Sequence, residues 1–180
     1  MALWPAAWRA NLPWAGAADA FANIADVQGS QMPNVFTRLT ELQQGGWKLT
    51  RGVYDFAVHT GAQGTVDIFD VEGDVMVQVL GVVETACTGA TATVELGVAG
   101  TVNLLLAQTT AADLTVGDLW HDATPTTDAE IVDVYGDHTA LISQGKDIIL
   151  TIATADLTAG KINFYAFWKP LSNDGDIVAA

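Results

Sequence analysis

The sequence predicts a mainly β protein: an antiparallel β-sandwich of jelly-roll or Greek-key type, preceded by an extended N-terminal arm with one short helix. From residue 53 onward, apolar residues recur with the period of two that is typical of strands, in about nine short runs separated by glycines. No helical pattern interrupts these runs, as expected for all-β sandwiches and barrels. The predicted boundaries are 1–52 for the arm, 53–172 for the sandwich and 173–180 for a short frayed tail.

The distribution of charge changes at the same boundary. Residues 1–52 hold four Lys or Arg against three acids, whereas residues 53–180 hold three against eighteen, and the whole chain has a net charge of −14. Because neutralising phosphates requires clustered cations, we expect no nucleic-acid partner. The apolar start of the chain has no basic leader, and no apolar run approaches the roughly 18 residues of a membrane span. We therefore expect no membrane segment, and synthesis in a cytoplasm.

The arm carries large apolar side chains without a sustained periodicity, and prolines and glycines interrupt it. Asn34 is positioned to cap a short helix over about residues 35–44, which Gly45 and Gly46 would end. Large apolar side chains need a partner surface, which is either the domain's own sheet or a neighbouring subunit. The candidate interface residues are the large apolar residues of the arm and of one helix face: Trp4, Trp8, Trp14, Phe21, Val35, Leu39 and Leu42.

Two of the expected strands are the clearest. Residues 74–84 are apolar on both faces, which predicts a central strand, and residues 91–98 alternate so that one face is solvated. The strand-poor stretch 109–129 is expected to be the long crossover between the sheets. Further strands are expected at 53–59, 65–71, 103–108, 130–135, 139–143, 146–154 and 161–169. Seven inward-pointing residues are expected to share one core: Val79, Val94, Leu96, Leu150, Ile152, Phe164 and Trp168.

Residue types that perform chemistry in enzymes are present, but their spacing indicates no site. His59, His121 and His138 lie on different expected elements, without the local spacing of metal ligands. The pair His121-Asp122 resembles a metal-binding pair of certain phosphohydrolases but lacks their helical context. The single cysteine, Cys87, cannot form an internal disulfide and is expected to be a small, semi-buried residue. We therefore expect no catalytic residues, no cofactor and no enzymatic activity.

Acidic residues gather in two parts of the sequence, and carboxylate oxygens are ligands that Ca²⁺ prefers. Neither group has the Asp-x-Asp-x-Asp-Gly spacing of a known calcium loop. Acids in hairpin turns are ordinarily solvated, so no metal site is predicted, and a structural Ca²⁺ stays an open alternative. The two groups are Asp67, Asp70, Glu72 and Asp74, and Asp128, Glu130, Asp133 and Asp137.

Five segments carry a resemblance to a known class of proteins: GDVMVQVLGVVE (73–84), GATATVELGV (89–98), LAQTT (106–110), LWHDATP (119–125) and DIILTIATAD (147–156). In style and order these segments resemble virion structural proteins from the head gene clusters of tailed bacteriophages, over about residues 65–172. The resemblance implies a capsid decoration or cement protein, a class that commonly forms trimers on the outer shell of the head. It also implies the major capsid protein and further copies of the chain as partners. No binding residues follow from it, because the class offers no short motif that can be matched residue by residue.

Two other functions remain as alternatives at the level of sequence. One is a glycan-binding or host-binding module of a head or tail fibre, for which Trp120 beside His121 and Asp122 is the candidate aromatic platform. The other is a tail-tube or connector protein, which also uses β-sandwiches and assembles into hexameric rings. The expected location in each case is the virion, and the capsid exterior for a decoration protein.

Overall fold

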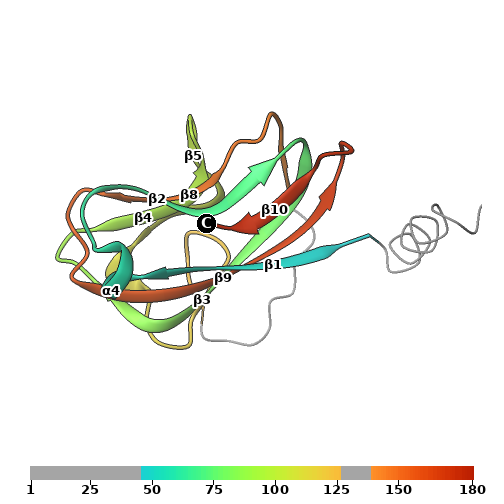
Figure 1. Cartoon of the computed structure of the whole chain (residues 1–180). Coiled ribbons are helices and arrows are strands. Elements are labelled where there is room, and N and C mark those ends of the chain that lie inside the picture. The colour runs from blue at the N-terminus through green and yellow to red at the C-terminus, as the bar shows by residue number, and fades with distance from the viewer. Residues whose placement is uncertain (1–45, 127–138) are drawn as a thin grey trace, which may run out of the picture. The chain divides into compact units, whose positions relative to one another are not determined.

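The computed structural model describes residues 46–126 and 139–180, and residues 47–180 form one compact unit. The predicted fold class is confirmed, because the described part is mainly β and consists of two antiparallel sheets (Figure 1). Two short helices lie in it, α4 (Phe56–His59) and the 3₁₀ helix η2 (Ala111–Asp113). Its strands are β1 (Lys48–Asp55), β2 (Gly64–Glu72), β3 (Val75–Thr88), β4 (Thr93–Val98), β5 (Thr101–Thr110), β6 (Leu119–Trp120), β7 (Ala140–Ile142), β8 (Ile148–Ala153), β9 (Ala159–Pro170) and β10 (Asp176–Ala179).

The strand pairing identifies the sandwich as a jelly roll. Sheet A has the order β1-β9-β3-β6, with β7 also paired to β3, and sheet B has the order β10-β2-β8-β4-β5. The pairs are nested along the chain, since β4 pairs with β5, β3 with β6 and β7, β2 with β8, and β1 with β9. Each pair encloses the previous one, and successive pairs alternate between the sheets, as in the double Greek key of a jelly roll. β3 has neighbours on both sides, so its predicted central position is confirmed.

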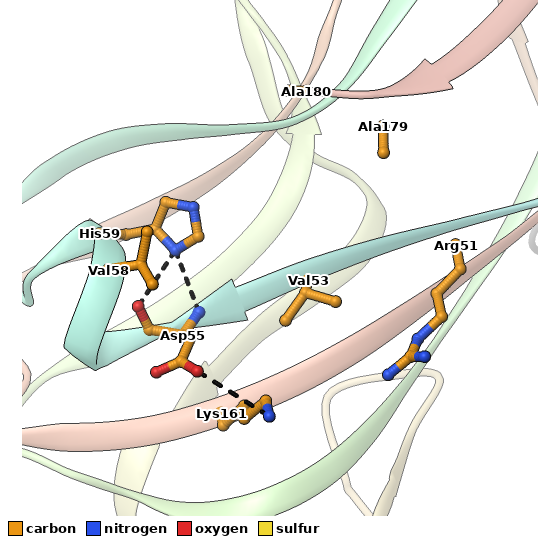
Figure 2. Close-up of a pocket in the computed structure, with 8 residues that line it drawn as sticks. All are labelled: Arg51, Val53, Asp55, Val58, His59, Lys161, Ala179 and Ala180. Carbon is orange, nitrogen blue, oxygen red and sulfur yellow. Dashed lines mark hydrogen bonds and ion pairs between the residues drawn. The ribbon is translucent and has the colours of Figure 1, made fainter.

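The expected strand over residues 53–59 ends early and continues as helix α4. The Asp55 side chain caps this helix by accepting a hydrogen bond of 2.9 Å from the main-chain N–H of Ala57. Nδ1 of His59 lies 3.0 Å from the main-chain nitrogen of Asp55 (Figure 2). These side-chain contacts give the backbone an alternative to the strand, which the apolar alternation alone does not reveal. At its other end β1 begins at Lys48, so the sandwich starts before the predicted boundary at residue 52.

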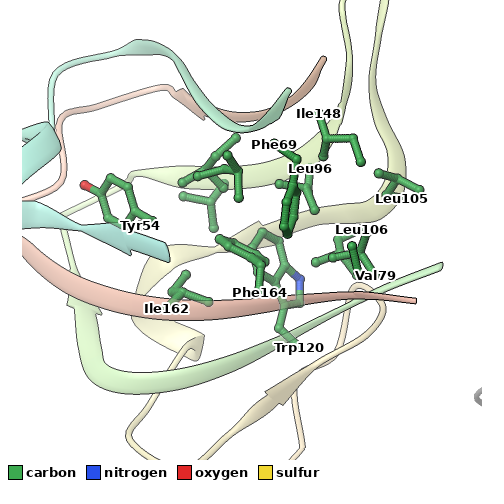
Figure 3. Close-up of a cluster of buried hydrophobic side chains, with 14 of the residues drawn as sticks. Tyr54, Phe69, Val79, Leu96, Leu105, Leu106, Trp120, Ile148, Ile162 and Phe164 are labelled. Carbon is green, nitrogen blue, oxygen red and sulfur yellow. The ribbon is translucent and has the colours of Figure 1, made fainter. Parts of the chain in front are cut away.

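The core lies between the two sheets, where side chains from both inner faces meet (Figure 3). Along β9 every second residue from Ile162 to Trp168 is buried in this core, as expected for a strand with one inward face. Leu96 and Leu150 contribute from sheet B and Phe164 from sheet A, each with no exposed area. All seven residues predicted for the core belong to it, which confirms that prediction.

The expected crossover over residues 109–129 contains a strand that the sequence did not predict. β6 is only two residues long and pairs with Gly81 and Val82 of β3. Its Trp120 is fully buried, and Nε1 of Trp120 donates a hydrogen bond of 3.0 Å to Oγ1 of Thr109. Trp120 thus holds the crossover against the core, together with Ala111 and Leu114, which also have no exposed area. The expected strand over residues 130–135 lies outside the described residues.

The end of the chain differs from the predicted frayed tail. β10 pairs with β2 at the edge of sheet B, and Ile177 is only 2% exposed. The Thr50 hydroxyl donates a hydrogen bond of 2.9 Å to the Ile177 carbonyl and accepts one of 2.9 Å from Nε1 of Trp168. β10 is therefore tied to both sheets, and the buried isoleucine supplies an apolar contact that a frayed end would lack.

Candidate interaction surface

The outward side of sheet A is lined by apolar side chains. In β9 and β3 the residues that alternate with core positions point away from the core. The register places them in rows with residues of β1: Leu49 opposite Phe167, and Arg51 opposite Tyr165. The same rows continue into β3, where Phe167 is opposite Gln78 and Tyr165 opposite Leu80. We call the following residues the apolar face: Leu49, Val53, Met76, Leu80, Val82, Leu119, Leu141, Tyr165 and Phe167.

Exposure within the apolar face is greatest at its two edges. Leu49 on β1 is 58% exposed and Leu141 on β7 is 67% exposed. The side chains between them are half-buried by one another. Trp47 precedes β1 and is 37% exposed, with the ammonium group of Lys169 4.9 Å from its ring. The face thus extends across the sheet, with the buried polar residues Gln78 and Asn163 between its apolar members, and it is open to solvent at both edges.

Charged residues of both signs lie on the same side of sheet A and pair with one another. Nη2 of Arg51 donates to Oδ1 of Asn163 at 2.6 Å, and Nδ2 of Asn163 donates to Oε2 of Glu84 at 2.9 Å. Nζ of Lys161 lies 2.9 Å from Oε1 of Glu84 and 3.9 Å from Oδ2 of Asp55. The hydrogen bond from Asn163, and then the one from Lys161, lowers the pKa of the Glu84 carboxyl. This polar network borders the apolar face at the end near α4.

The rest of the described surface is acidic by comparison. The outward side of sheet A holds three cations (Arg51, Lys161, Lys169) against two acids, Asp55 and Glu84. The other described residues hold two cations against twelve acids. The outward side of β2 in sheet B alone presents three exposed acids, Asp67, Asp70 and Glu72. The sandwich therefore has one nearly neutral, apolar side and one acidic side.

An open depression of about 460 Å³ lies beside the polar network (Figure 2). Its polar groups already have partners, since Lys161 contacts Glu84 and Asp55, and His59 contacts the main chain of Asp55. The polar side chains that line the depression are therefore engaged in contacts within the fold. They do not place a nucleophile next to a free base. Its lining residues are Arg51, Val53, Asp55, Val58, His59, Lys161, Ala179 and Ala180.

The histidines and acids that the sequence offered as metal ligands do not gather in the described residues. Nδ1 of His121 lies 3.6 Å from Oδ2 of its neighbour Asp122, and His59 is in α4. In residues 46–126 and 139–180, no group of three or more His, Cys, Asp or Glu side chains is arranged to hold a metal ion. His138 and the acids of 128–137 lie outside these ranges.

Trp120 is not the exposed aromatic platform that a glycan-binding site would require. Its side chain is completely buried, and its ring centroid lies 6.1 Å from that of Phe164 in the core. Cys87 is also buried, at 2% exposure, and burial raises the pKa of its thiol to about 12. Both residues therefore belong to the interior of the sandwich and present no reactive or binding group to solvent.

The interface residues predicted in the arm, together with the helix expected over 35–44, lie outside the described residues. The apolar face of sheet A is the surface that sequence reasoning missed. Its signal was the apolar second face of residues 74–84, which we attributed to a central strand. A central position satisfies the backbone hydrogen bonds of a strand, whereas apolar side chains on both faces require cover on both faces.

Comparison with models of known protein families, with curated proteins and with solved structures finds no match to this chain. Among the described residues, no helix has the length and hydropathy needed to cross a membrane.

Proposed function

We propose that this chain is a non-enzymatic structural protein of a tailed-phage virion, which binds the outer surface of the capsid shell and stabilises it. Its partners are the major capsid protein and further copies of itself, as a homotrimer assembled after synthesis in the host cytoplasm. The observation that carries this proposal is the contrast between the two outer sides of the sandwich. The apolar side suits contact with protein, and the acidic side suits exposure to solvent on the outside of a particle.

The resemblance to phage head proteins supports the same function. The five resembling segments contain most of β3, all of β4, the end of β5, and all of β6 and β8. A jelly roll by itself hosts many unrelated functions, so the fold carries no argument for a capsid. The argument rests on the surface and on the resemblance together.

Attachment to the shell is assigned to the arm. Residues 1–52 have a net charge of +1, whereas the remainder has −15, so docking the arm on a protein surface requires little desolvation of charge. Trp4, Trp8 and Trp14, with the expected helix over 35–44, provide the large apolar side chains for the contact. The acidic side of the sandwich then stays in solvent.

A truncation tests this assignment. A variant that begins at Trp47 keeps all of β1, including Thr50 with its bonds to Trp168 and Ile177. We expect it to keep the β-type circular dichroism of the parent but to fail to co-sediment with empty shells of the major capsid protein. The full chain should co-sediment and raise the temperature at which the shells disrupt.

A matched pair of full-length variants separates loss of the arm's anchors from loss of chain length. Replacing Trp4, Trp8 and Trp14 together by Ala should abolish co-sedimentation, whereas Val116→Ala, at an exposed loop position, should leave it unchanged. Equal shell binding by the truncated and full chains would show that the arm is not the anchor. A full chain that binds no shell and forms hexameric rings would replace the proposal with a tail-tube or connector function.

A further inference from the structure

We infer that the apolar face of sheet A is the surface on which a second copy of this chain packs. This inference rests on the self-association that forms part of the proposed function. For the free protein in solution, it assigns a two-fold contact between two copies to a surface of the sandwich, whereas the head-to-tail contacts of the homotrimer belong to the assembled shell. The arm remains the anchor to the shell. The inference rests on the continuity of the apolar face, its size and the distribution of charge around it.

The apolar face is larger and more continuous than scattered surface apolar residues. The rows through Phe167, Tyr165 and Val53 each join β1, β9 and β3, and a fourth row joins Met76 of β3 to Leu141 of β7. Each row also holds one polar residue: Gln78, Arg51, Asn163 and Lys169, respectively. With strands about 4.8 Å apart and rows about 7 Å apart, the part of the sheet that these rows span, polar positions included, is roughly 20 Å by 14 Å, or about 300 Å². A patch of this size is at the lower end of what marks an interaction site on a soluble domain.

The size of the face also predicts how strong the contact is. A standard protein interface buries about 800 Å² on each partner, so the apolar face alone supplies less than half of that area. Trp47, at 37% exposure beside the face, extends it. We therefore expect a weak, reversible association that depends on protein concentration. On a shell, where the local concentration of the protein is high, the association would be complete.

The distribution of charge identifies the occupant as a second copy. Two copies that approach through any other part of the described surface bring acidic surfaces together, because ten acids that are not buried face two cations there. Through the apolar face the nearest charges are of mixed sign, because three cations (Arg51, Lys161 and Lys169) lie there with two acids, Asp55 and Glu84. A contact of this mixed-charge surface with its own copy is self-complementary and relates the two copies by a two-fold axis.

Packing through sheet A also separates the acidic sides. Sheets in a sandwich lie about 10 Å apart, so two sandwiches packed through their A sheets hold their B sheets roughly 30 Å apart. That separation is several times the Debye length of about 8 Å at physiological ionic strength. At an ionic strength of about 0.01 M the Debye length is about 30 Å, so there the two acidic sides still repel each other. Raising the salt concentration from that level should strengthen the association, because it screens this repulsion without weakening an apolar contact.

The test is sedimentation velocity of the full chain over a range of concentration, with charge-introducing variants of exposed residues. Leu49→Glu and Leu141→Glu each place a carboxylate on the apolar face, at positions that are 58% and 67% exposed. The matched controls Val178→Glu and Val116→Glu add the same charge at positions that are 50% and 64% exposed and lie off sheet A. Thermal melts of all four variants verify that the fold is retained.

We expect the parent and the controls to associate increasingly with concentration and with added NaCl. Both face variants should sediment as the 18.9 kDa monomer under the same conditions. A parent that remains monomeric at every concentration overturns the inference, and so do face variants that associate like the parent. Face variants that associate normally but no longer bind shells would identify the shell as the occupant instead. Self-association without any shell binding would keep this inference while overturning the proposed function.

Discussion

Removing the side chain of Trp120 is the most demanding test of the fold. The result distinguishes a crossover whose Trp120 is buried in the core from one whose Trp120 is exposed as a platform for glycans. In the structure Trp120 is fully buried between the sheets, contacts Phe164 and donates its indole N–H to the Thr109 hydroxyl at 3.0 Å. On an exposed platform for glycans, the same residue would contribute almost nothing to stability. Trp120→Ala therefore separates the two arrangements.

The expected cost follows from the contacts. Truncating a buried Trp to Ala typically destabilises by about 3–5 kcal/mol, through lost transfer energy and the cavity that remains. The lost hydrogen bond adds about 1 kcal/mol, since the Thr109 hydroxyl keeps the Ala107 carbonyl as a partner at 3.2 Å. A total of about 4–6 kcal/mol is comparable to the whole stability of many domains. Thr109→Val leaves the indole N–H buried without an acceptor and should cost about 1–3 kcal/mol.

Urea unfolding of the variant that begins at Trp47, followed by circular dichroism, measures these costs. With a denaturant slope of about 2 kcal/mol/M, Trp120→Ala should lower the midpoint by about 2–3 M. His121→Ala at the neighbouring, partly exposed position is the control and should change stability by less than about 1 kcal/mol. The cost of Thr109→Val should also shrink in a Trp120→Phe background, which has no N–H to satisfy. A Trp120→Ala protein that unfolds within about 1 kcal/mol of its parent would show that Trp120 is outside the core.

Three further outcomes are expected from the remaining contacts. Cys87 should react with iodoacetamide at pH 8 about a thousandfold more slowly in the native protein than in urea, because raising its pKa from 9.0 to about 12 removes the thiolate. Rapid native labelling, measured by mass spectrometry, would contradict its burial. The lowered pKa of Glu84 means that its contribution to stability is present above the ordinary pKa of 4.5 and is lost as the pH falls through its lower folded pKa. The urea midpoints of Glu84→Gln and its parent should therefore differ most above pH 4.5 and converge in more acidic buffer. A difference that stays constant with pH would show that ionised Glu84 does not stabilise the fold. Leu150→Ala and Phe164→Ala should each lower the free energy of unfolding by about 2–5 kcal/mol, and parent-like melting of both would show that the inward register is wrong.

The sequence determined the class of fold, most of the strands and the core. Alternation along residues 91–98 and 161–169 predicted β4 and β9, and it assigned Val94, Leu96 and Phe164 to the interior. These predictions succeed because the direction of a side chain along a strand is a local property, repeated every two residues. The acidity of the chain was likewise read directly from composition.

The tertiary structure alone decided the features that depend on distant partners. β6 has two residues and β10 has four, which are too few to show a period. β6 is held in place by the hydrogen bond from Trp120 to Thr109, and β10 by the hydrogen bond from Thr50 to the carbonyl of Ile177. The apolar face needed the register of β1, β9 and β3, since only pairing brings Leu49 and Phe167 into one row. The sequence of a strand that is apolar on both sides predicts that both sides are covered. Which surface covers them depends on contacts between segments far apart in the chain or between separate chains.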